Sequence, residues 1–151
     1  MTPREFAIHA HGDQKYGDNP YVFHLDQVYA LAVEYGLSED HQAAAYLHDV
    51  VEDCGVSYDE IWSLFGHYVQ YLVWGVTGKG RNRKARIKDQ AWKMNDKDIC
   101  LLKLCDRIAN IEHAAKTGNT RIMNMYAKEH EEFSKLYFKD PLWDRYINLF
   151  K

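Results

Sequence analysis

The stretch Tyr46-Leu47-His48-Asp49-Val50-Val51-Glu52-Asp53 places an imidazole and three carboxylates within an apolar run. In a continuous helix, residues four apart lie on one face, so His48 would lie above Glu52 and Asp49 above Asp53. Buried carboxylates without a partner are costly or take up protons instead. Because a bound cation removes this cost, we interpret the stretch as half of a metal site, with Glu52 and Asp53 beside it as candidate catalytic acids.

The rest of the chain carries the signals that begin and end helices. Thr2-Pro3-Arg4-Glu5 and Ser57-Tyr58-Asp59-Glu60 have the form of capping boxes, and Asp96 precedes a long apolar run. The expected helices cover residues 2–16, 21–36 (or from Asp26), 38–54, 57–66, 67–77, 96–118 and 119–138, with a last one from 140. Periodicity alone also allows a strand over 67–77, but its length and its neighbours favour a helix. Val, Ile and Tyr do not alternate long enough for a sheet. The sequence therefore predicts one all-α domain over residues 1–151, a helical bundle with the metal site between its helices.

The bulk properties limit the classes of function. The chain has 151 residues, a net charge of −3 and a hydrophobic share of 46%, which argues against a protein that coats nucleic acid. No apolar run approaches the ~20 residues that span a bilayer, and the N-terminus lacks the apolar stretch of a signal peptide. The three cysteines, Cys54, Cys100 and Cys105, lack CxxC spacing. We therefore expect reduced thiols in a cytoplasmic protein without membrane partners.

Two polar residues on other expected helices complete a candidate metal site. His24 lies at the start of the second helix, and Asp106 interrupts an apolar face of the long helix from Asp96. With His48 and Asp49 they supply two neutral nitrogens and two anionic oxygens. This mixture suits Mn²⁺, Fe²⁺, Co²⁺, Ni²⁺ or Zn²⁺ better than Ca²⁺. Four protein ligands on an octahedral ion leave positions for water and a phosphate oxygen, which is typical of hydrolytic sites.

The order of these ligands is similar to that of a known family. His24, then His48-Asp49, then Asp106 resembles the HD-domain metal-dependent phosphohydrolases. Further motifs extend the resemblance to the guanosine polyphosphate (ppGpp) 3′-pyrophosphohydrolases, which are the hydrolase halves of long stringent-response enzymes and their small stand-alone relatives. These motifs, within residues 5–113, are Ala10–Lys15, Pro20–His24, Leu47–Asp53, Phe65-Gly66, Val76-Thr77 and Lys103–Asn110.

The resemblance implies a reaction and a set of roles. It implies hydrolysis of ppGpp or pppGpp to GDP or GTP and pyrophosphate, with Mn²⁺ as the metal. By the same resemblance, Glu52 and Asp53 handle the attacking water, and Asn110 lies near the substrate phosphate. The chain departs from the family in the loop before Pro20, which is one residue shorter and has only Lys15 as a basic residue. Cys105 stands where the family usually has a small alanine.

Six basic residues and no acid lie between Lys79 and Lys88. A charge run is usually a solvated face, but a mildly acidic protein has little reason to concentrate positive charge. We expect an electropositive lip that includes Arg86 and draws a polyphosphate to the metal, because guanidinium groups bind phosphate with paired hydrogen bonds. The candidate substrate-binding residues are Lys15, Arg81, Arg83, Lys84 and Asn110.

Two other functions fit the same residues. An HD enzyme with this metal site can act on another nucleotide, such as a nucleoside monophosphate, a deoxynucleoside triphosphate or a cyclic nucleotide. A binding module for nucleotides or nucleic acid would use the run from Lys79 to Lys88 as its contact surface. The complete set of four ligands and two acids argues against such a degenerate site. The oligomeric state is not readable from the sequence.

Overall fold

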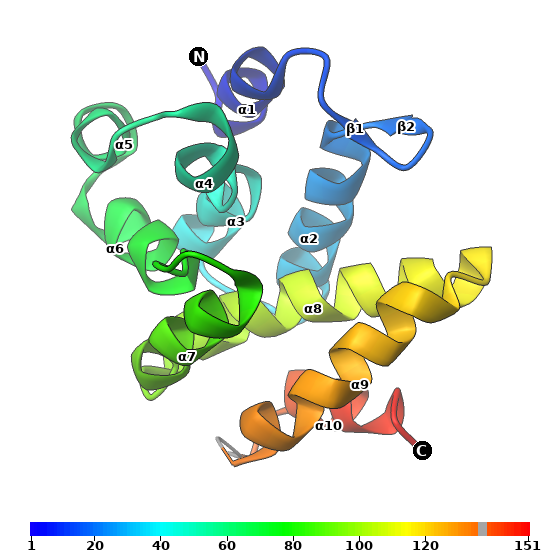
Figure 1. The fold of residues 1–151 in the computed structure, drawn as a ribbon. Helices are drawn as coiled ribbons and strands as arrows, with labels where there is room; N and C mark the ends of the chain where they lie inside the picture. Colours follow the sequence, from blue (N-terminus) through cyan, green and yellow to red (C-terminus); the bar gives the residue numbers. More distant parts are fainter. Residues whose placement is uncertain (136–138) are drawn as a thin grey trace.

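Helices make up most of the computed structural model, which describes residues 1–135 and 139–151 (Figure 1). They are α1 (Pro3–His11), α2 (Val22–Glu34), α3 (Glu39–Leu47), α4 (Val50–Cys54), α5 (Tyr58–Phe65), α6 (His67–Val76), α7 (Arg83–Lys93), α8 (Lys97–Thr117), α9 (Thr120–Ser134) and α10 (Pro141–Asn148). A small antiparallel hairpin of β1 (Lys15–Tyr16) and β2 (Asn19–Pro20) joins α1 to α2. The predicted all-α class is confirmed. Within the described residues, no helix is both long and apolar enough to cross a membrane.

Several helices begin where the sequence places their caps. The hydroxyl groups of Thr2 and Ser57 accept hydrogen bonds from backbone amides three residues later, and the carboxylate of Asp96 accepts from the amides of Asp98 and Ile99. These bonds satisfy amide groups that a helix start otherwise leaves without partners. The predicted starts of α1, α5 and α8 are therefore confirmed.

Helix α8 is the central element of the fold. It packs against α2, α3, α6, α9 and α10, and in Figure 1 it runs through the middle of the molecule with the other helices on both sides. Its side chains Leu102, Leu104 and Ile108 are fully buried. Because its neighbours include α2 and the end of α3, α8 holds residues from three distant parts of the chain near one another.

The predicted continuous helix over residues 38–54 is wrong. It is interrupted at His48 and Asp49, which separate α3 from α4. The imidazole Nδ1 of His48 donates a hydrogen bond to the backbone oxygen of Ala45 (2.7 Å), the group that the amide of Asp49 would use in a continuous helix. The side chain thus replaces the backbone bond, and both residues lie at the junction of two short helices.

One predicted helix end also differs, and another cannot be compared. Helix α1 ends at His11 rather than near Tyr16, because Gly12 has a φ of 54°, a left-handed conformation that glycine adopts easily. Tyr16 belongs instead to the hairpin. Helix α9 ends at Ser134, and the predicted end at Phe138 lies outside the described residues.

Helix α7 is attached to α6 largely through polar groups. The two buried residues of α7 are Gln90 and Lys93. The amide nitrogen of Gln90 donates to the backbone oxygen of Val76 (2.6 Å), and the Lys93 ammonium donates to the oxygen of Thr77 (3.1 Å) and lies over the ring of Trp74. These bonds fix the orientation of α7 relative to α6.

The close packing of α6 on α8 yields a first prediction. A Cβ atom added at Gly75 would lie 2.4 Å from Cδ1 of Ile99, so Gly75→Ala forces α6 away from α8. We expect a net loss of about 1–2 kcal/mol in the free energy of unfolding, because overpacking outweighs the roughly 1 kcal/mol by which alanine favours a helix. Urea denaturation followed by circular dichroism measures this change.

The control for this prediction is a double-mutant cycle with Ile99→Ala, which removes the contacting side-chain atoms. The double variant should be less destabilised than the sum of the two single changes. Gly75→Ala that is as stable as the original protein would contradict the proposed contact.

Candidate metal centre

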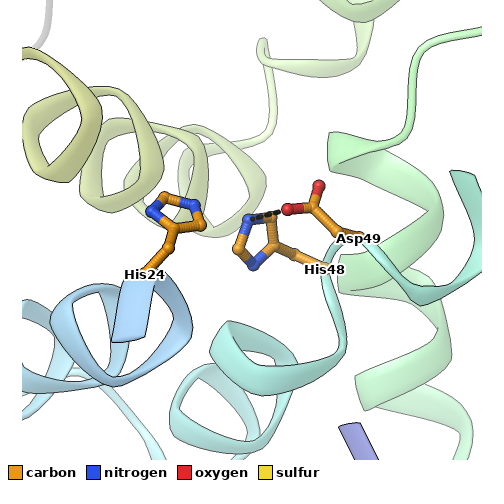
Figure 2. A group of neighbouring side chains, drawn as sticks. All are labelled: His24, His48 and Asp49. Carbon is orange, nitrogen blue, oxygen red and sulfur yellow. Dashed lines mark ion pairs between the residues drawn. The ribbon is translucent and has the colours of Figure 1, made fainter. Parts of the chain in front are cut away.

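The four side chains predicted to bind a metal converge at the junction of α2, α8 and the break between α3 and α4. Potential ligand atoms of His24, His48 and Asp49 all lie within 4.8 Å of one another, and Figure 2 shows the two rings and the carboxylate gathered in one place. Oδ1 of Asp106 lies 3.0 Å from Nε2 of His24 and 3.2 Å from Nε2 of His48. The sequence order therefore identified residues that are neighbours in space.

The ring of His48 is oriented as a metal ligand would be. Its Nδ1 donates to the Ala45 oxygen, so in the neutral ring Nε2 carries the lone pair. Nε2 lies 3.0 Å from Oδ2 of Asp49 and 3.2 Å from Oδ1 of Asp106. It nevertheless makes no hydrogen bond of acceptable geometry to any described residue. A lone pair and two carboxylates facing one point repel one another unless a cation lies between them, so the donor set fits a divalent ion.

The charges of this cluster act strongly on one another. Burial alone would raise the pKa of Asp49, but the adjacent charge of His48 lowers this pKa to about 2. Burial likewise opposes ionisation of Asp106, yet Lys103 and His48 hold the pKa of Asp106 well below its usual value. Burial would lower the pKa of His48, but Asp49 and Asp106 outweigh it and hold that pKa well above its ordinary value. The cluster thus retains negative charge that demands a cation or a proton.

Two tyrosines of the hairpin region support these groups. Tyr21 donates a hydrogen bond to Oδ2 of Asp49 (2.5 Å). Tyr16 stacks on the ring of His24, with ring centroids 4.6 Å apart, and donates to Oδ1 of Asn110 (2.6 Å). Burial, followed by the charge of Asp106, raises the pKa of Tyr16 to about 12, so its hydroxyl remains a donor. Hydrogen bonds from such outer groups orient metal ligands.

Asp106 is held by two further groups on its own helix. Nδ2 of Asn110 donates to Oδ1 of Asp106 (3.1 Å), and the Lys103 ammonium donates to Oδ2 (3.2 Å). Lys103 is absent from the residues that the sequence analysis selected. Its position three residues before Asp106, which puts both on one helix face, is a signal that would have identified it.

The two candidate catalytic acids lie on α4 beside the cluster. Glu52 approaches the guanidinium of Arg86, with Oε1 3.6 Å from Nε. Burial, and then the charge of Asp49, raises the pKa of Glu52. The carboxylate of Asp53 accepts a hydrogen bond from the side-chain amide of Gln14 (3.1 Å). Both acids line the same cavity as the metal-binding cluster.

This cavity has a volume of about 200 Å³ and joins the acidic cluster to three cations. Arg83 and Arg86 reach it from α7, and Lys103 reaches it from α8. Arg83 and Arg86 are three residues apart, so they share one face of α7. A site that holds carboxylates and cations next to one another can bind a metal ion and a phosphoryl group side by side.

The structure divides the predicted substrate-binding residues into two sets. Arg83 and Asn110 line the cavity. Lys15, Arg81 and Lys84 do not: Lys15 and Arg81 are exposed in β1 and in the loop before α7, and Lys84 lines a separate groove beside α9. Arg83 borders both the cavity and this groove, whereas Lys84, which points about 100° away around the helix, borders only the groove. The predicted lip is therefore only partly directed at the metal cluster.

Two bacterial proteins are similar in sequence to part of this chain. The guanosine-3′,5′-bis(diphosphate) 3′-pyrophosphohydrolase of Aquifex aeolicus is 36% identical over 115 residues, which cover 72% of this chain and 16% of that protein. The enzyme of the same name from Vibrio cholerae is 34% identical over 109 residues, which cover 66% of this chain and 16% of that protein. The chain thus spans 16% of the length of these relatives.

Solved structures share the fold over most of the chain. A metazoan ortholog of SpoT that hydrolyses ppGpp superposes with a TM-score of 0.85 and 26% identity, covering 98% of this chain and 91% of that protein. A protein of Listeria monocytogenes EGD-e superposes with a TM-score of 0.74 and 20% identity, covering 86% of this chain and 94% of that protein. This second match shows a similar fold only. The sequence model of the HD domain matches residues 4–139. Because this match takes in nearly all of the helical fold, the chain belongs to the HD-domain family.

Proposed function

We propose that this chain is a metal-dependent phosphohydrolase that removes the 3′-pyrophosphate of ppGpp or pppGpp to give GDP or GTP and pyrophosphate. The observation that carries this proposal is the cavity in which an imidazole–carboxylate cluster faces Arg83, Arg86 and Lys103. The activity of the similar bacterial and metazoan proteins supports the same substrate. A ppGpp hydrolysis assay with Mn²⁺, read by chromatography of the products, tests the proposal.

An HD domain implies a divalent metal, and Mn²⁺ is the ion that we propose for this site. The proposed ligands are His24, His48, Asp49 and Asp106, whose mixture of imidazole and carboxylate suits this ion. When bound, such an ion lowers the pKa of a coordinated water and polarises a phosphoryl oxygen.

The side chains around the cluster have distinct proposed roles. Glu52 accepts the proton of the attacking water, for which its raised pKa is suitable, and Asp53, held by Gln14, orients that water. Arg83 and Lys103 bind the departing diphosphate and stabilise its charge.

The remaining predicted contacts belong to the rest of the nucleotide. Asn110 lines the cavity and is proposed to lie near the substrate phosphate. Lys15, Arg81 and Lys84 are proposed to contact parts of the nucleotide that extend beyond the cavity, because each is exposed outside it.

Two proposals concern the chain as a whole. We propose that residues 1–151 form one domain, since a single cluster of buried apolar side chains extends from Ala7 in α1 to Tyr146 in α10. A cytoplasmic location is supported by the thiols of Cys54, Cys100 and Cys105, which form no disulfide within the described part of the chain.

A second candidate substrate is another nucleotide acted on by the same metal site. Lys15, the single basic residue of its loop, lies outside the cavity, which weakens the argument for a highly charged guanosine polyphosphate. Nucleoside monophosphates, deoxynucleoside triphosphates and cyclic nucleotides assayed beside ppGpp distinguish these substrates. A non-catalytic nucleotide- or nucleic-acid-binding module is a weaker candidate, because both acids lie beside a complete ligand set.

Replacing one proposed ligand should remove both metal and turnover. We expect Asp106→Asn to weaken Mn²⁺ binding by at least about 100-fold, because it removes an anionic ligand from the buried cluster, and to abolish hydrolysis. Calorimetric titration with Mn²⁺ and elemental analysis measure the first effect. Asp98→Asn, on the same helix but outside the cavity, serves as the control and should bind the ion normally. Full metal content in Asp106→Asn would refute the ligand assignment.

The pH dependence of turnover should report the proposed base. A general base acts when deprotonated, so the raised pKa of Glu52 places the acidic limb of the kcat profile above the usual carboxylate range, with activity rising as pH rises. We expect Glu52→Gln to lower kcat by about 10²- to 10⁴-fold and to remove this limb while Mn²⁺ still binds. Glu60→Gln in α5 is the control. If the Glu52→Gln enzyme keeps the acidic limb of the kcat profile, a residue other than Glu52 is the general base.

Metal binding should release a proton near neutral pH. In the metal-free protein, Asp49 and Asp106 hold the pKa of His48 well above its ordinary value, so the ring is protonated and must lose that proton to bind an ion. We expect about one proton per Mn²⁺ from calorimetry in buffers of different ionisation enthalpy. His67→Gln, which changes an exposed histidine of α6, should leave this number unchanged. Binding heats that are independent of the buffer would contradict the expectation.

A further inference from the structure

Two arginines share one carboxylate at the edge of the metal cavity. Oε2 of Glu129 accepts a hydrogen bond from Nε of Arg83 (2.7 Å), and Oε1 accepts from Nη2 of Arg83 (3.1 Å) and from Nη1 of Arg107 (3.0 Å). The three residues belong to α7, α8 and α9. Since Glu129 lies 46 residues from Arg83 in the sequence, no local motif connects them.

Arg107 fixes the position of this carboxylate. Its side chain is fully buried, and its guanidinium lies 3.7 Å from the ring centroid of Phe133 and 4.6 Å from that of Tyr126. A buried guanidinium needs a fixed anionic partner, and Glu129 supplies it. Burial opposes ionisation of Glu129, but its bonds to Arg83 and Arg107 hold its pKa below the usual value. Glu129 is thus a charged hydrogen-bond acceptor whose position is fixed by the buried Arg107.

The contact leaves one edge of the Arg83 guanidinium available to an anion, beside Tyr126, whose ring centroid lies 5.4 Å from Cζ of Arg83 and whose side chain also interacts with it. A guanidinium has five N–H groups, and Glu129 takes the one on Nε and one on Nη2, which leaves the other edge of the fork. Arg83 also lines the metal cavity, together with Arg86 and Lys103. One carboxylate between two guanidinium groups leaves a surplus positive charge, and Arg83 is the more exposed of the two. The carboxylate therefore orients Arg83 and does not occupy its phosphate-binding edge.

We propose that Glu129, anchored by Arg107, is a positioning residue that directs Arg83 into the metal cavity to bind the diphosphate group of the substrate. The identity of the diphosphate rests on the proposed function, whereas the positioning applies to any phosphoryl group that enters the cavity. Pre-orientation reduces the entropy that a long side chain loses on binding. The fork geometry then gives paired, charge-assisted hydrogen bonds.

The direction in which removal of the Glu129 charge changes anion binding distinguishes a positioning role from a simple effect of charge. Glu129 is negative, so its removal would strengthen the binding of an anion if only its charge mattered. If Glu129 positions Arg83, its removal weakens that binding. Glu129→Gln is the suitable change, because the amide oxygen still accepts a hydrogen bond from Arg107. Glu132→Gln is the matched control, since Glu132 lies on the same helix and pairs only with Lys135 among the described residues.

The experiment measures the binding of inorganic pyrophosphate by calorimetry, with the protein in a constant excess of Mn²⁺. It also measures KM and kcat for ppGpp hydrolysis. We expect Arg83→Gln to weaken pyrophosphate binding by about 30-fold and Glu129→Gln by about 10-fold. KM should rise in parallel, and kcat should also fall, because Arg83 stabilises the charge of the departing group. In the Arg83→Gln background, Glu129→Gln should have no further effect, and Glu132→Gln alone should leave binding unweakened. Unchanged Mn²⁺ affinity and melting temperature show that each variant is folded.

Two results would overturn the inference. Glu129→Gln that binds pyrophosphate as tightly as the original protein, or more tightly, excludes a positioning role. An equal loss with and without Arg83 shows that Glu129 does not act through it. Should Glu129→Gln not fold, Glu129→Asp replaces it: the charge stays near Arg107 but the shorter side chain withdraws from Arg83, and the same weakening is expected. Absence of ppGpp turnover with pyrophosphate binding intact refutes the proposed substrate and leaves the positioning role standing.

Discussion

Two carboxylates and one imidazole nitrogen face a common point between α2, α8 and the start of α4. Asp49 and Asp106 approach Nε2 of His48 to 3.0 and 3.2 Å, and two carboxylates gathered in a buried environment repel each other unless a proton on His48 or a bound cation lies between them. The surrounding structure resists this repulsion with directed donors. Tyr21 bonds Asp49, and Lys103 bonds Asp106. The centre therefore remains assembled because the helices and the hairpin hold its ligands in place.

The helix break at His48 is part of the same constraint. A continuous helix would direct the side chains of His48 and Asp49 about 100° apart around a regular axis. The bond from the imidazole to the Ala45 oxygen ends α3 and lets the chain turn before α4 begins. Both side chains can then approach Asp106 on α8. The cost of a lost backbone hydrogen bond is offset by the side-chain bond that replaces it.

The sequence selected four polar residues that prove to be close in space, and their role as metal ligands stays a prediction. His24, His48, Asp49 and Asp106 are polar residues on apolar segments, and the fold brings them together. The helix break was not predictable from periodicity, because the apolar pattern of α3 continues through Val50 and Val51 of α4.

Contacts made at long range were not predictable either. Tyr16 and Tyr21 depend on a hairpin of two-residue strands that has no alternating pattern, and Glu129 meets Arg83 across 46 residues. Lys15 and Lys84 fail to reach the cavity because β1 and the turn of α7 direct them elsewhere. Residue type therefore predicts the chemistry of this centre better than it predicts the surface that recognises a substrate.

The attachment of α7 has an evolutionary consequence. This helix supplies cations to the cavity, yet its two buried side chains are polar. Besides the packing of Ile87 and the contact of Trp92 with Trp74, it is linked to the body by hydrogen bonds and ion pairs. Substitutions on such a helix do not open voids in an apolar core, so they are tolerated more readily than changes in α8. Substitutions on α7 would then change the proposed contacts to a nucleotide without altering the proposed ligands of the ion. Ligand preference and hydrolytic chemistry are thus free to diverge at different rates within one fold.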